Sequence, residues 1–468
     1  MNQKRETTVL LLSLLITIGA IAGGLWWLTT KTNNSLNSST SNLDNTAKTS
    51  TNLTPEQIST GNNILISQNI TPEKQLATKA LAQGNEPEAV LLLEKSLSKQ
   101  PNDPEALIYL NNARIGDVRS HSIAVPVPIG TEMTTAQEIL RGVAQAQNEI
   151  NQQGGINGEP LKVFLADDNN NPEVAKKIAH KLVAHRDILG VVGHFSSGVT
   201  LATAPIYQEN GLVAISATST SISLSDAGNY IFRTVPSDRF TSSVLAKYFL
   251  EKLNQRQAAV IYNSQSDYSN SLKNTFTTDI LSNGGLIATE VDLSQSNFNP
   301  ADIIQKARSQ GAEALIFLND STTANKAYLL MQVNNRQLPM LGGDSMYKPQ
   351  TLQVVGQNAV DLVLSVPWHI LGNTSSNFPT AARRLWGGDV NWRTAMAYDA
   401  TKSLIAGITN DPTRQGIQQT LSDANFSFEG ASGTVKFLAS GDRSQSVQLV
   451  TVKPGNRSPF GYDFVPVK

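Results

Sequence analysis

The sequence predicts an α/β protein with two doubly wound lobes, each built on a parallel sheet. From Ser122 onward, short β-branched runs alternate with segments of helical periodicity, which is the pattern of parallel βαβ units. The alternation restarts after residues 232–234, and each half is long enough for its own sheet. The chain of 468 residues also exceeds the roughly 250–300 residues at which a single core stops growing. Several domains are therefore expected.

Composition limits the partners and the chemistry. Lys and Arg number 37 against 38 Asp and Glu, so the charge gives no basis for binding nucleic acid. Cysteine is absent, which excludes disulfides, thiolate metal ligands, a cysteine nucleophile and the acylated N-terminal cysteine of a bacterial lipoprotein. Stability must therefore come from packing.

Residues 9–28 form an uncharged apolar run that is long enough to cross about 30 Å of hydrocarbon as a helix. The basic residues concentrate before this run, so the positive-inside rule places the remainder of the chain outside the cytoplasm. Residues 20–22 have the small-x-small form of a signal-peptide cleavage site, whereas Trp26 and Trp27 suit an interfacial belt. We expect an uncleaved anchor over residues 1–30, with a signal peptide as the alternative.

Two further segments precede the α/β region. Residues 31–70 are dominated by Thr, Asn and Ser, and this composition predicts a flexible linker. Residues 71–116 have apolar positions at helical spacing and proline at three helix starts, Pro72, Pro87 and Pro104. We expect two or three short helices that resemble one tetratricopeptide repeat. One repeat cannot bury its own apolar face, so either it packs on its neighbour or the resemblance is superficial. A helical spacer is favoured over a peptide-binding array.

The first half of the α/β region contains two β-α pairs and a longer βαβ unit. The helix before Gly154 ends at a glycine pair, and Asn171 stands as an N-cap before Pro172. The expected elements are a strand at 123–129, a helix at 135–151, a strand at 161–166, a helix at 172–185 and the βαβ unit at 187–220.

The second half repeats the alternation and ends in helices and a strand-rich tail. Its expected strands lie at 258–262, 286–293, 314–318, 340–341 and 362–366. Its expected helices lie at 240–253, 268–281, 301–310, 323–334, 380–385, 392–407 and 413–423.

Hydroxyl side chains follow two neighbouring strands of the first half. Ser196 and Ser197 open the helix after one strand, and Ser219 and Thr220 follow the next. Ligands of doubly wound sheets bind beyond the carboxyl ends of the strands, where helix N-termini present unpaired N–H groups. Serines before Gly198 are also typical of a helix N-cap. Hydroxyls at two adjoining strand ends favour a small-molecule site.

Catalytic and metal-binding motifs are absent from the sequence. It has no G-x-G-x-x-G after a strand, no phosphate loop, no G-x-S-x-G elbow and no H-E-x-x-H. His180 and His185 stand five positions apart, which does not place them on one helical face as metal ligands. Residues 167–171 offer many oxygens but lack the spacing of a calcium loop. We therefore expect no enzymatic activity, no cofactor and no metal.

Eight motifs follow one another in a fixed order between residues 121 and 468. They are IAVPVPIGTEM, INQQGGINGEPLKVFLADDNNNP, ILGVVGHFSSGVTLATAPIYQENGLVAISATSTS, YIFRTVPSD, AAVIYNSQSDYSNS, ALIFLND, MLGGDSM and TAMAYDATKSLIAGI. Their order and spacing resemble those of type I periplasmic binding proteins, in particular the leucine/isoleucine/valine-binding family of ABC importers. The resemblance implies two lobes joined by three hinge crossovers, near 236–240, 365–368 and 428–433.

The same resemblance implies the lobe boundaries and the location. Lobe 1 would comprise 121–237 plus 369–430, and lobe 2 would comprise 238–368 plus 431–468. The protein would capture a free amino acid in the cleft and deliver it to an ABC permease. It would stand at the periplasmic or extracytoplasmic face of the bacterial inner membrane, anchored through residues 9–28. A ligand-sensing ectodomain of a signalling complex is the alternative, which would need a separate output subunit.

Family motifs also imply roles for individual residues. Ser197, Ser219 and Thr220 would hold the ligand α-carboxylate, which agrees with the affinity of a helix N-terminus for anions. Asp344 would meet the α-ammonium, since a cation needs a charge partner once the cleft excludes water. Tyr268 matches a family tyrosine.

Three positions bear on ligand identity. Tyr398 in AYDA matches a tyrosine of the returning segment in the family. The aromatic residue that the family has in the first loop is replaced around Thr134. Asp320 stands near where a second-lobe tyrosine is common, and it favours either a polar or cationic ligand or simply a solvated loop aspartate. The side chain of the ligand is therefore left open.

Overall fold

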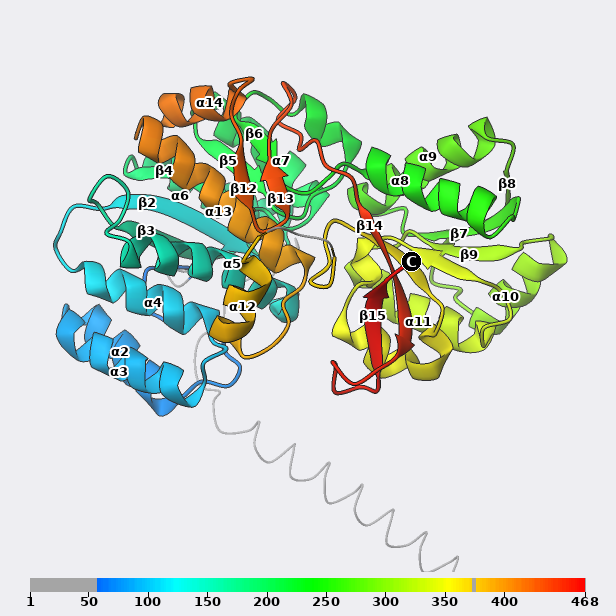
Figure 1. Cartoon of the computed structure of the whole chain (residues 1–468), viewed down its shortest axis with the longest axis horizontal. Helices are drawn as coiled ribbons and strands as arrows, with labels where there is room; N and C mark the ends of the chain where they lie inside the picture. The colour runs from blue at the N-terminus through cyan, green and yellow to red at the C-terminus, as the bar shows by residue number, and fades with distance from the viewer. Residues whose placement is uncertain (1–56, 373–375, 468) are drawn as a thin grey trace, which may run out of the picture. The chain divides into compact units, whose positions relative to one another are not determined.

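Two parallel sheets flanked by helices form the two lobes of the protein (Figure 1). The computed structural model describes residues 57–372 and 376–467, which all fall in one unit, Leu53–Lys468. The first sheet has the order β1-β3-β2-β4-β5-β6 and the second has the order β15-β14-β11-β10-β9-β7-β8. The predicted pair of α/β lobes is confirmed.

Lobe 1 is a layered structure with helices on both faces of its sheet. Its parallel strands are β2 (His121–Val127), β3 (Leu161–Asp167), β4 (Ile188–Val192), β5 (Val213–Ser216) and β6 (Ile231–Arg233). Its helices are α5 (Met133–Gln152), α6 (Pro172–Ala184), α7 (Ser197–Glu209), α12 (Phe378–Trp386), α13 (Trp392–Asn410) and α14 (Arg414–Ser422). Alternate residues of a strand point to opposite faces. Accordingly, Ile123 and Val125 join the core under α5 and α13, whereas Ala124 joins the core under α6 and α7.

Lobe 2 repeats this layering and adds two antiparallel strands at its edge. Its parallel strands are β7 (Gln257–Tyr262), β8 (Leu286–Asp292), β9 (Ala314–Phe317), β10 (Met340–Gly342) and β11 (Val363–Val366), followed by antiparallel β14 (Gln448–Pro454) and β15 (Tyr462–Pro466). Its helices are α8 (Asp238–Lys247), α9 (Asp267–Ser282), α10 (Pro300–Ser309) and α11 (Ala324–Asn334). Val260 packs with α8 and α9, and Ile261 faces the opposite core.

The chain crosses between the sheets three times, and the third crossing lies later than predicted. Strands β12 (Phe428–Gly430) and β13 (Gly433–Val435) form a hairpin at α13, so the expected crossing at 428–433 is wrong. Arg443 stays with lobe 1, where its guanidinium pairs with Asp399 of α13 at 3.0 Å and both side chains are fully buried. A buried guanidinium left without this carboxylate would be strongly destabilising. The chain therefore passes to β14 only after Arg443, and residues 431–443 belong to lobe 1.

The segment before the lobes is folded from residue 57 onward. Strand β1 (Ile58–Ser59) pairs antiparallel with β3, and Ile66 is buried. Glu105 accepts hydrogen bonds from the backbone N–H groups of Leu65 and Ile66 at 2.7 and 3.2 Å. The expected linker is therefore wrong for residues 57–70, because a distant buried carboxylate orders a stretch whose own composition is polar.

Three helices follow, as predicted: α2 (Pro72–Ala82), α3 (Glu86–Lys99) and α4 (Pro104–Ile115). Asn112 of α4 donates to the carbonyl of Val163 at 2.8 Å and accepts from the N–H of the same residue at 3.0 Å. Its Oδ1 also accepts from Gln147 of α5 at 2.9 Å. Every residue of α4 except Arg114 is buried. α4 is therefore a structural part of lobe 1, which is the packing on a neighbour that a single repeat needs.

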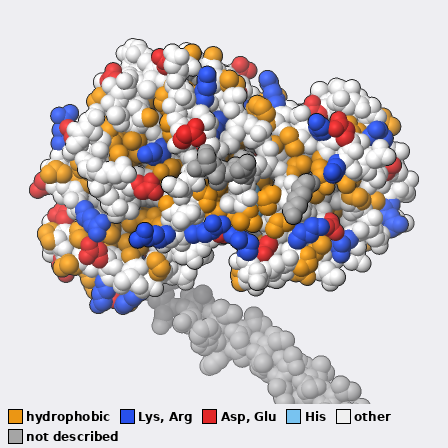
Figure 2. Space-filling view, in the orientation of Figure 1, with side chains coloured by type: hydrophobic (Ala, Val, Ile, Leu, Met, Phe, Trp, Pro, Cys, Tyr) orange, Lys and Arg blue, Asp and Glu red, His pale blue; other side chains and the backbone are white. Residues whose placement is uncertain are grey.

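The predicted membrane segment, residues 9–28, lies outside the described residues. Within residues 57–372 and 376–467, no helix is long and apolar enough to cross a membrane. Acidic and basic side chains are spread over both lobes on the face shown in Figure 2.

Candidate functional site

A cavity lies between the two lobes, at the carboxyl ends of their parallel strands, where ligands of doubly wound sheets bind. Lobe 1 contributes Asn170, Phe195, Ser196, Ser197, Thr218, Trp392 and Arg393. Lobe 2 contributes Ser266, Tyr268, Asp320, Ser321, Asp344 and Ser345. Of the predicted site residues, the structure brings together Ser196, Ser197, Tyr268, Asp320 and Asp344.

The start of α7 forms one wall of the cavity. Ser196 occupies the N-cap position, yet its side chain makes no capping bond. Its hydroxyl donates instead to Oδ1 of Asn170 at 2.6 Å. Ser197 accepts a hydrogen bond from the N–H of Ser221 at 3.3 Å through its own hydroxyl. No side chain caps α7, so its first N–H groups and the positive end of its dipole are available to an anion.

The hydroxyl that β5 presents to the cavity comes from Thr218 and not from the two predicted residues after it. Ser216 ends β5 and accepts from the N–H of Ser219 at 3.0 Å, which turns the loop early. Ser219 is buried behind the wall, with its hydroxyl 2.8 Å from that of Thr200. Thr220 is also buried, and its hydroxyl has no hydrogen-bond partner among the described residues.

A buried histidine fixes the loop that leads into α7. Nδ1 of His194 lies 2.6 Å from Oδ2 of Asp168, and Nε2 lies 2.9 Å from the hydroxyl of Tyr207. The backbone carbonyl of His194 accepts from Ser216 at 2.8 Å. Side-chain networks of this kind rigidify the groups they join, so the serines of α7 are held in place before any ligand arrives. Asp168 serves this network, and Asn171 caps α6 as predicted.

The opposite wall centres on Asp344, at the end of β10. Its side chain is buried, and the hydroxyl of Tyr268 donates to its Oδ1 at 3.1 Å. The pKa of Asp344 is raised to about 7, mainly by burial; Arg393 opposes the shift, and the carboxylate of Asp238 adds to it. A carboxylate in this environment is stabilised by any cation that enters the cavity.

Asp238, which opens α8, is a second buried carboxylate near Asp344. Burial raises its pKa to about 6, although the nearby hydroxyls of Ser271 and Thr220 oppose the shift. Neither of its oxygens has a partner in hydrogen-bond geometry among the described residues. Asp238 therefore adds negative potential to the site without lining the cavity.

Asp320 lines the cavity, but its oxygens are engaged by two threonines of its own loop and by Asn263, which follows β7. Its Oδ1 accepts from Nδ2 of Asn263 at 3.0 Å and from the hydroxyl of Thr323 at 2.9 Å, and Oδ2 accepts from that of Thr322 at 2.9 Å. These bonds favour the loop-aspartate interpretation over a contact with a cationic ligand.

Tyr398 lies away from the cavity. Its hydroxyl donates to Oε2 of Glu149 at 2.6 Å, and its ring packs on Phe378 with centroids 4.8 Å apart. Both partners belong to helices of lobe 1, so the structure gives Tyr398 a packing role.

Sequence reasoning missed two cavity residues at the start of α13, Trp392 and Arg393. The guanidinium of Arg393 donates to Glu138 at 3.1 Å and, across the lobes, to the backbone carbonyls of Tyr347 and Asp344 at 3.3 and 3.4 Å. The available signal was the N-cap Asn391 immediately before them, which accepts from the N–H of Arg393 at 2.8 Å. An N-cap residue predicts where a helix begins, but it does not predict that the helix start binds a ligand.

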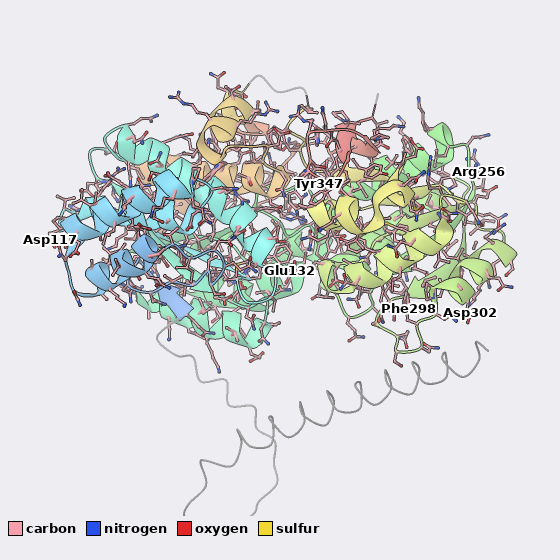
Figure 3. All side chains as sticks on the ribbon, turned by 90° about the horizontal axis from the view of Figure 1, so that it is seen from below. Asp117, Glu132, Arg256, Phe298, Asp302 and Tyr347 are labelled. Atoms are coloured by element: carbon pink, nitrogen blue, oxygen red, sulfur yellow. The ribbon has the colours of Figure 1, made fainter. Side chains whose placement is uncertain are left out.

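A second bond across the lobes joins Lys348 to Glu132 at 2.9 Å. Figure 3 shows Glu132 and Tyr347 at the junction of the lobes. Burial lowers the pKa of Lys348, against the opposing effect of Glu132. Together with Arg393, this pair holds the lobes around the cavity.

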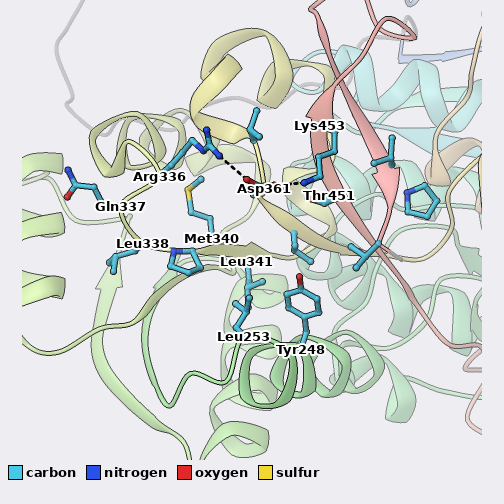
Figure 4. A pocket seen from close by; sticks show the side chains of 16 residues that line it. Tyr248, Leu253, Arg336, Gln337, Leu338, Met340, Leu341, Asp361, Thr451 and Lys453 are labelled. Carbon is cyan, nitrogen blue, oxygen red and sulfur yellow. Dashed lines mark hydrogen bonds and ion pairs between the residues drawn. The ribbon is translucent and has the colours of Figure 1, made fainter.

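A larger cavity of about 770 Å³ lies within lobe 2, away from this site (Figure 4). It sits at the amino ends of β10 and β11, where the sheet directs no helix N-terminus toward a ligand. Its main charged groups are already paired with one another, because Asp361 pairs with Arg336 at 2.9 Å and with Lys453. In the described part of the chain, no group of three His, Asp or Glu side chains could hold a metal. The interlobe cavity is therefore the candidate site.

A family model and several relatives match most of the α/β region of the chain. The family model described as periplasmic binding protein matches residues 122–457. An amino acid binding protein of Pseudomonas aeruginosa is 30% identical over 191 residues, which are 40% of this chain and 50% of that protein. Leu/Ile/Val-binding protein homolog 3 of Brucella melitensis is 26% identical over 337 residues, which are 69% of this chain and 88% of that protein.

Solved structures share the fold. An ABC transporter substrate-binding protein from Desulfitobacterium hafniense in complex with Leu has a TM-score of 0.64 at 24% identity, over 74% of this chain and 100% of that chain. The branched-chain amino acid transporter substrate-binding protein of Streptococcus pneumoniae in complex with isoleucine has a TM-score of 0.65 at 20% identity, over 75% and 100%. A solute-binding protein from R. palustris in complex with 4-hydroxybenzoate has a TM-score of 0.65 at 15% identity, over 75% and 96%.

Proposed function

Because the chain belongs to the periplasmic binding protein family, we propose that it is an extracytoplasmic solute-binding protein that captures a free amino acid between its lobes for an ABC importer. One observation carries the proposal: an uncapped helix N-terminus and the buried Asp344, whose side chain forms no salt bridge among the described residues, face the same interlobe cavity. These groups are complementary to the carboxylate and the ammonium that every free amino acid carries.

The anionic end of the ligand belongs at the start of α7. Ser197 presents a hydroxyl there that accepts from the N–H of Ser221, which leaves its own proton for the ligand. The hydroxyls of Ser196 and Thr218 already donate to Asn170 and to the backbone carbonyl of Phe195. Hydrogen bonds to a charged acceptor are stronger than neutral ones, and the helix dipole adds to them. The network around His194 keeps these donors in position, so less ordering entropy is lost on binding.

The cationic end belongs at Asp344. The ammonium supplies the positive charge that this carboxylate lacks, and Tyr268 orients the carboxylate by donating to Oδ1. Ligand groups that contact both lobes bind the closed state more tightly than the open state, so binding favours closure. The bonds of Arg393 and Lys348 across the lobes then add to the stability of the closed state.

The comparisons support a solute-binding role in transport but not one particular solute. Relatives named for amino acids and a fold neighbour that holds 4-hydroxybenzoate share this architecture. Isothermal titration of the purified protein with the twenty amino acids tests the proposal. We expect saturable binding of at least one amino acid at micromolar concentration, and absence of binding at millimolar concentrations would contradict the proposal.

We also propose that residues 9–28 hold the protein at the membrane. The support is their uninterrupted apolar composition and the charge before them. When the gene is expressed from its first codon in a bacterial host, the protein should stay in the membrane pellet after alkaline carbonate extraction. Release of a shortened chain into the soluble fraction would instead identify a cleaved signal peptide.

A further inference from the structure

A third cavity, of about 370 Å³, lies between the lobes and shares no lining residue with the candidate site. Lobe 1 contributes Arg141 of α5 and Trp386 of α12, and lobe 2 contributes Tyr347 and Phe460. Asn102, in the segment between α3 and α4, also lines it. The volume falls within the roughly 300–1,000 Å³ that is typical of small-molecule sites. We refer to this space as the Arg141 cavity.

The accessible walls of the Arg141 cavity are mainly apolar. Tyr347 packs on Phe464 with ring centroids 4.3 Å apart, and both residues line the cavity together with Phe460. On the side of lobe 1, the indole N–H of Trp386 already donates to Gln145 at 3.3 Å, which leaves its ring as an apolar surface. Removal of apolar ligand surface from water against such walls is favourable. The walls therefore suit a ligand with an apolar body.

The guanidinium of Arg141 is a charged group without a carboxylate partner. Its Nε donates to Oδ1 of Asn102 at 2.6 Å, and this is an amide oxygen that carries no charge. Its two terminal nitrogens have no hydrogen-bond partner among the described residues, and in contrast to Nε of Arg393 they are not buried. Glu138 and Asp103 act on the pKa of Arg141 only through space, where they oppose the lowering that burial causes. The terminal N–H groups are therefore available to an acceptor in the cavity.

The other charged side chains around the Arg141 cavity already have partners. Lys348 pairs with Glu132, Glu138 with Arg393, Arg457 with Asp389 and Asp103 with Lys74, and Asp463 accepts from the backbone N–H groups of Arg457 and Ser458. Asp389 is also shared with Arg383. Because each of these carboxylates is already engaged, none of them is left to neutralise Arg141.

We propose that the Arg141 cavity is a second ligand site, which binds a small carboxylate with an apolar body. The carboxylate accepts hydrogen bonds from the terminal nitrogens of Arg141, whose planar fork matches the two oxygens of a carboxylate. The apolar body packs on the rings of Tyr347, Phe460 and Trp386. This site is separate from the one that the proposed function uses, so the two can be tested independently.

Isothermal titration of the unaltered full chain with benzoate, benzamide and inorganic phosphate tests both requirements of the site. Benzoate carries a carboxylate and an apolar ring, benzamide keeps the ring without the charge, and phosphate keeps a charge without the ring. We expect benzoate to bind about tenfold more tightly than either of the others, because hydrogen bonds to an ionised acceptor are stronger than neutral ones. Absence of benzoate binding at millimolar concentrations, or equally tight binding of benzamide or phosphate, would overturn the proposal and leave the proposed function intact.

Arg141→Gln tests whether benzoate binds in this cavity. The substitution removes the charge and keeps an N–H donor for Asn102, and we expect the affinity for benzoate to fall by about tenfold. Arg384→Gln is the matched control, because Arg384 is an exposed arginine of α12 that does not line the cavity, and its substitution should leave the affinity unchanged. Unchanged affinity of Arg141→Gln would place benzoate elsewhere and overturn the assignment. The comparison of the three probes on the unaltered chain does not depend on the folding of either variant.

Discussion

Asp344→Asn is expected to weaken amino-acid binding by about 100-fold or more. The substitution keeps the volume of the side chain and an acceptor for Tyr268, but it leaves the ligand ammonium without a charge partner in a closed cavity. Truncating one partner of a buried charge pair costs about 2–5 kcal/mol, and 100-fold corresponds to about 2.8 kcal/mol. Isothermal titration at pH 8, where the carboxylate of the unaltered protein is ionised, measures the loss.

The pH profile of the same two proteins provides a second readout. The pKa of Asp344 is raised to about 7, so in the unliganded protein the side chain becomes protonated as the pH falls through that value. A protonated side chain cannot pair with an ammonium, and the affinity of the unaltered protein should therefore fall by up to tenfold per pH unit below about 7. The affinity of Asp344→Asn should not change as the pH falls through 7. It should change only near pH 6, where Asp238 becomes protonated.

The matched control for this experiment is Asp361→Asn. Asp361 is also a lobe 2 carboxylate with cationic partners, Arg336 and Lys453, but it lies in the other cavity. Its substitution should leave ligand affinity and its pH profile unchanged. An affinity of Asp344→Asn within threefold of the unaltered chain would remove Asp344 from the ligand site.

Gly142→Ala is expected to lower the free energy of unfolding by about 3 kcal/mol, since overpacking against rigid groups costs about 1–3 kcal/mol or more. Gly142 lies where α5 meets α13, and an added Cβ would stand 2.2 Å from the backbone carbonyl oxygen of Thr394 and 2.6 Å from the backbone nitrogen of Tyr398. Neither atom can rotate away, so the two helices would have to separate. Urea denaturation followed by circular dichroism measures the change.

The sign of this effect separates packing from helix propensity. An unhindered glycine in a helix interior gains up to about 1 kcal/mol when it is replaced by alanine. Gly388→Ala is the control, because a Cβ there would meet no heavy atom within 4 Å. It should change the unfolding free energy by less than about 0.5 kcal/mol. An equal or higher urea midpoint for Gly142→Ala would show that the helices do not meet at this glycine.

Local patterns predicted most of the fold because they record which face of each element is buried. The alternation of β-branched and helical segments gave both sheets, and Asn171 capped α6 as its place before Pro172 indicated. The third crossing was missed because it depends on the pairing of Arg443 with Asp399, two residues far apart in the sequence. The folded conformation of residues 57–70 was missed for the same kind of reason, since it depends on a hydrogen bond to Glu105, which lies 40 positions later in the sequence.

The residues of the candidate site were likewise predictable where they depend on local patterns and not predictable where they depend on distant contacts. Ser196 and Ser197 were predictable because a helix that follows a parallel strand places its first residues at the ligand-binding edge of the sheet. Thr218 replaced Ser219 and Thr220 because the bond between Ser216 and the N–H of Ser219 turns the loop, which no local pattern predicts. Trp392 and Arg393 reach the cavity only because the chain returns to lobe 1 after building lobe 2.

Asn112 and β1 fasten the segment at 57–116 to lobe 1 through β3 and α5. Lobe 2 has no such segment among the described residues, and it is joined to lobe 1 through the three crossing segments and the contacts between the lobes. In any motion of one lobe relative to the other, the segment at 57–116 would therefore move as one body with lobe 1.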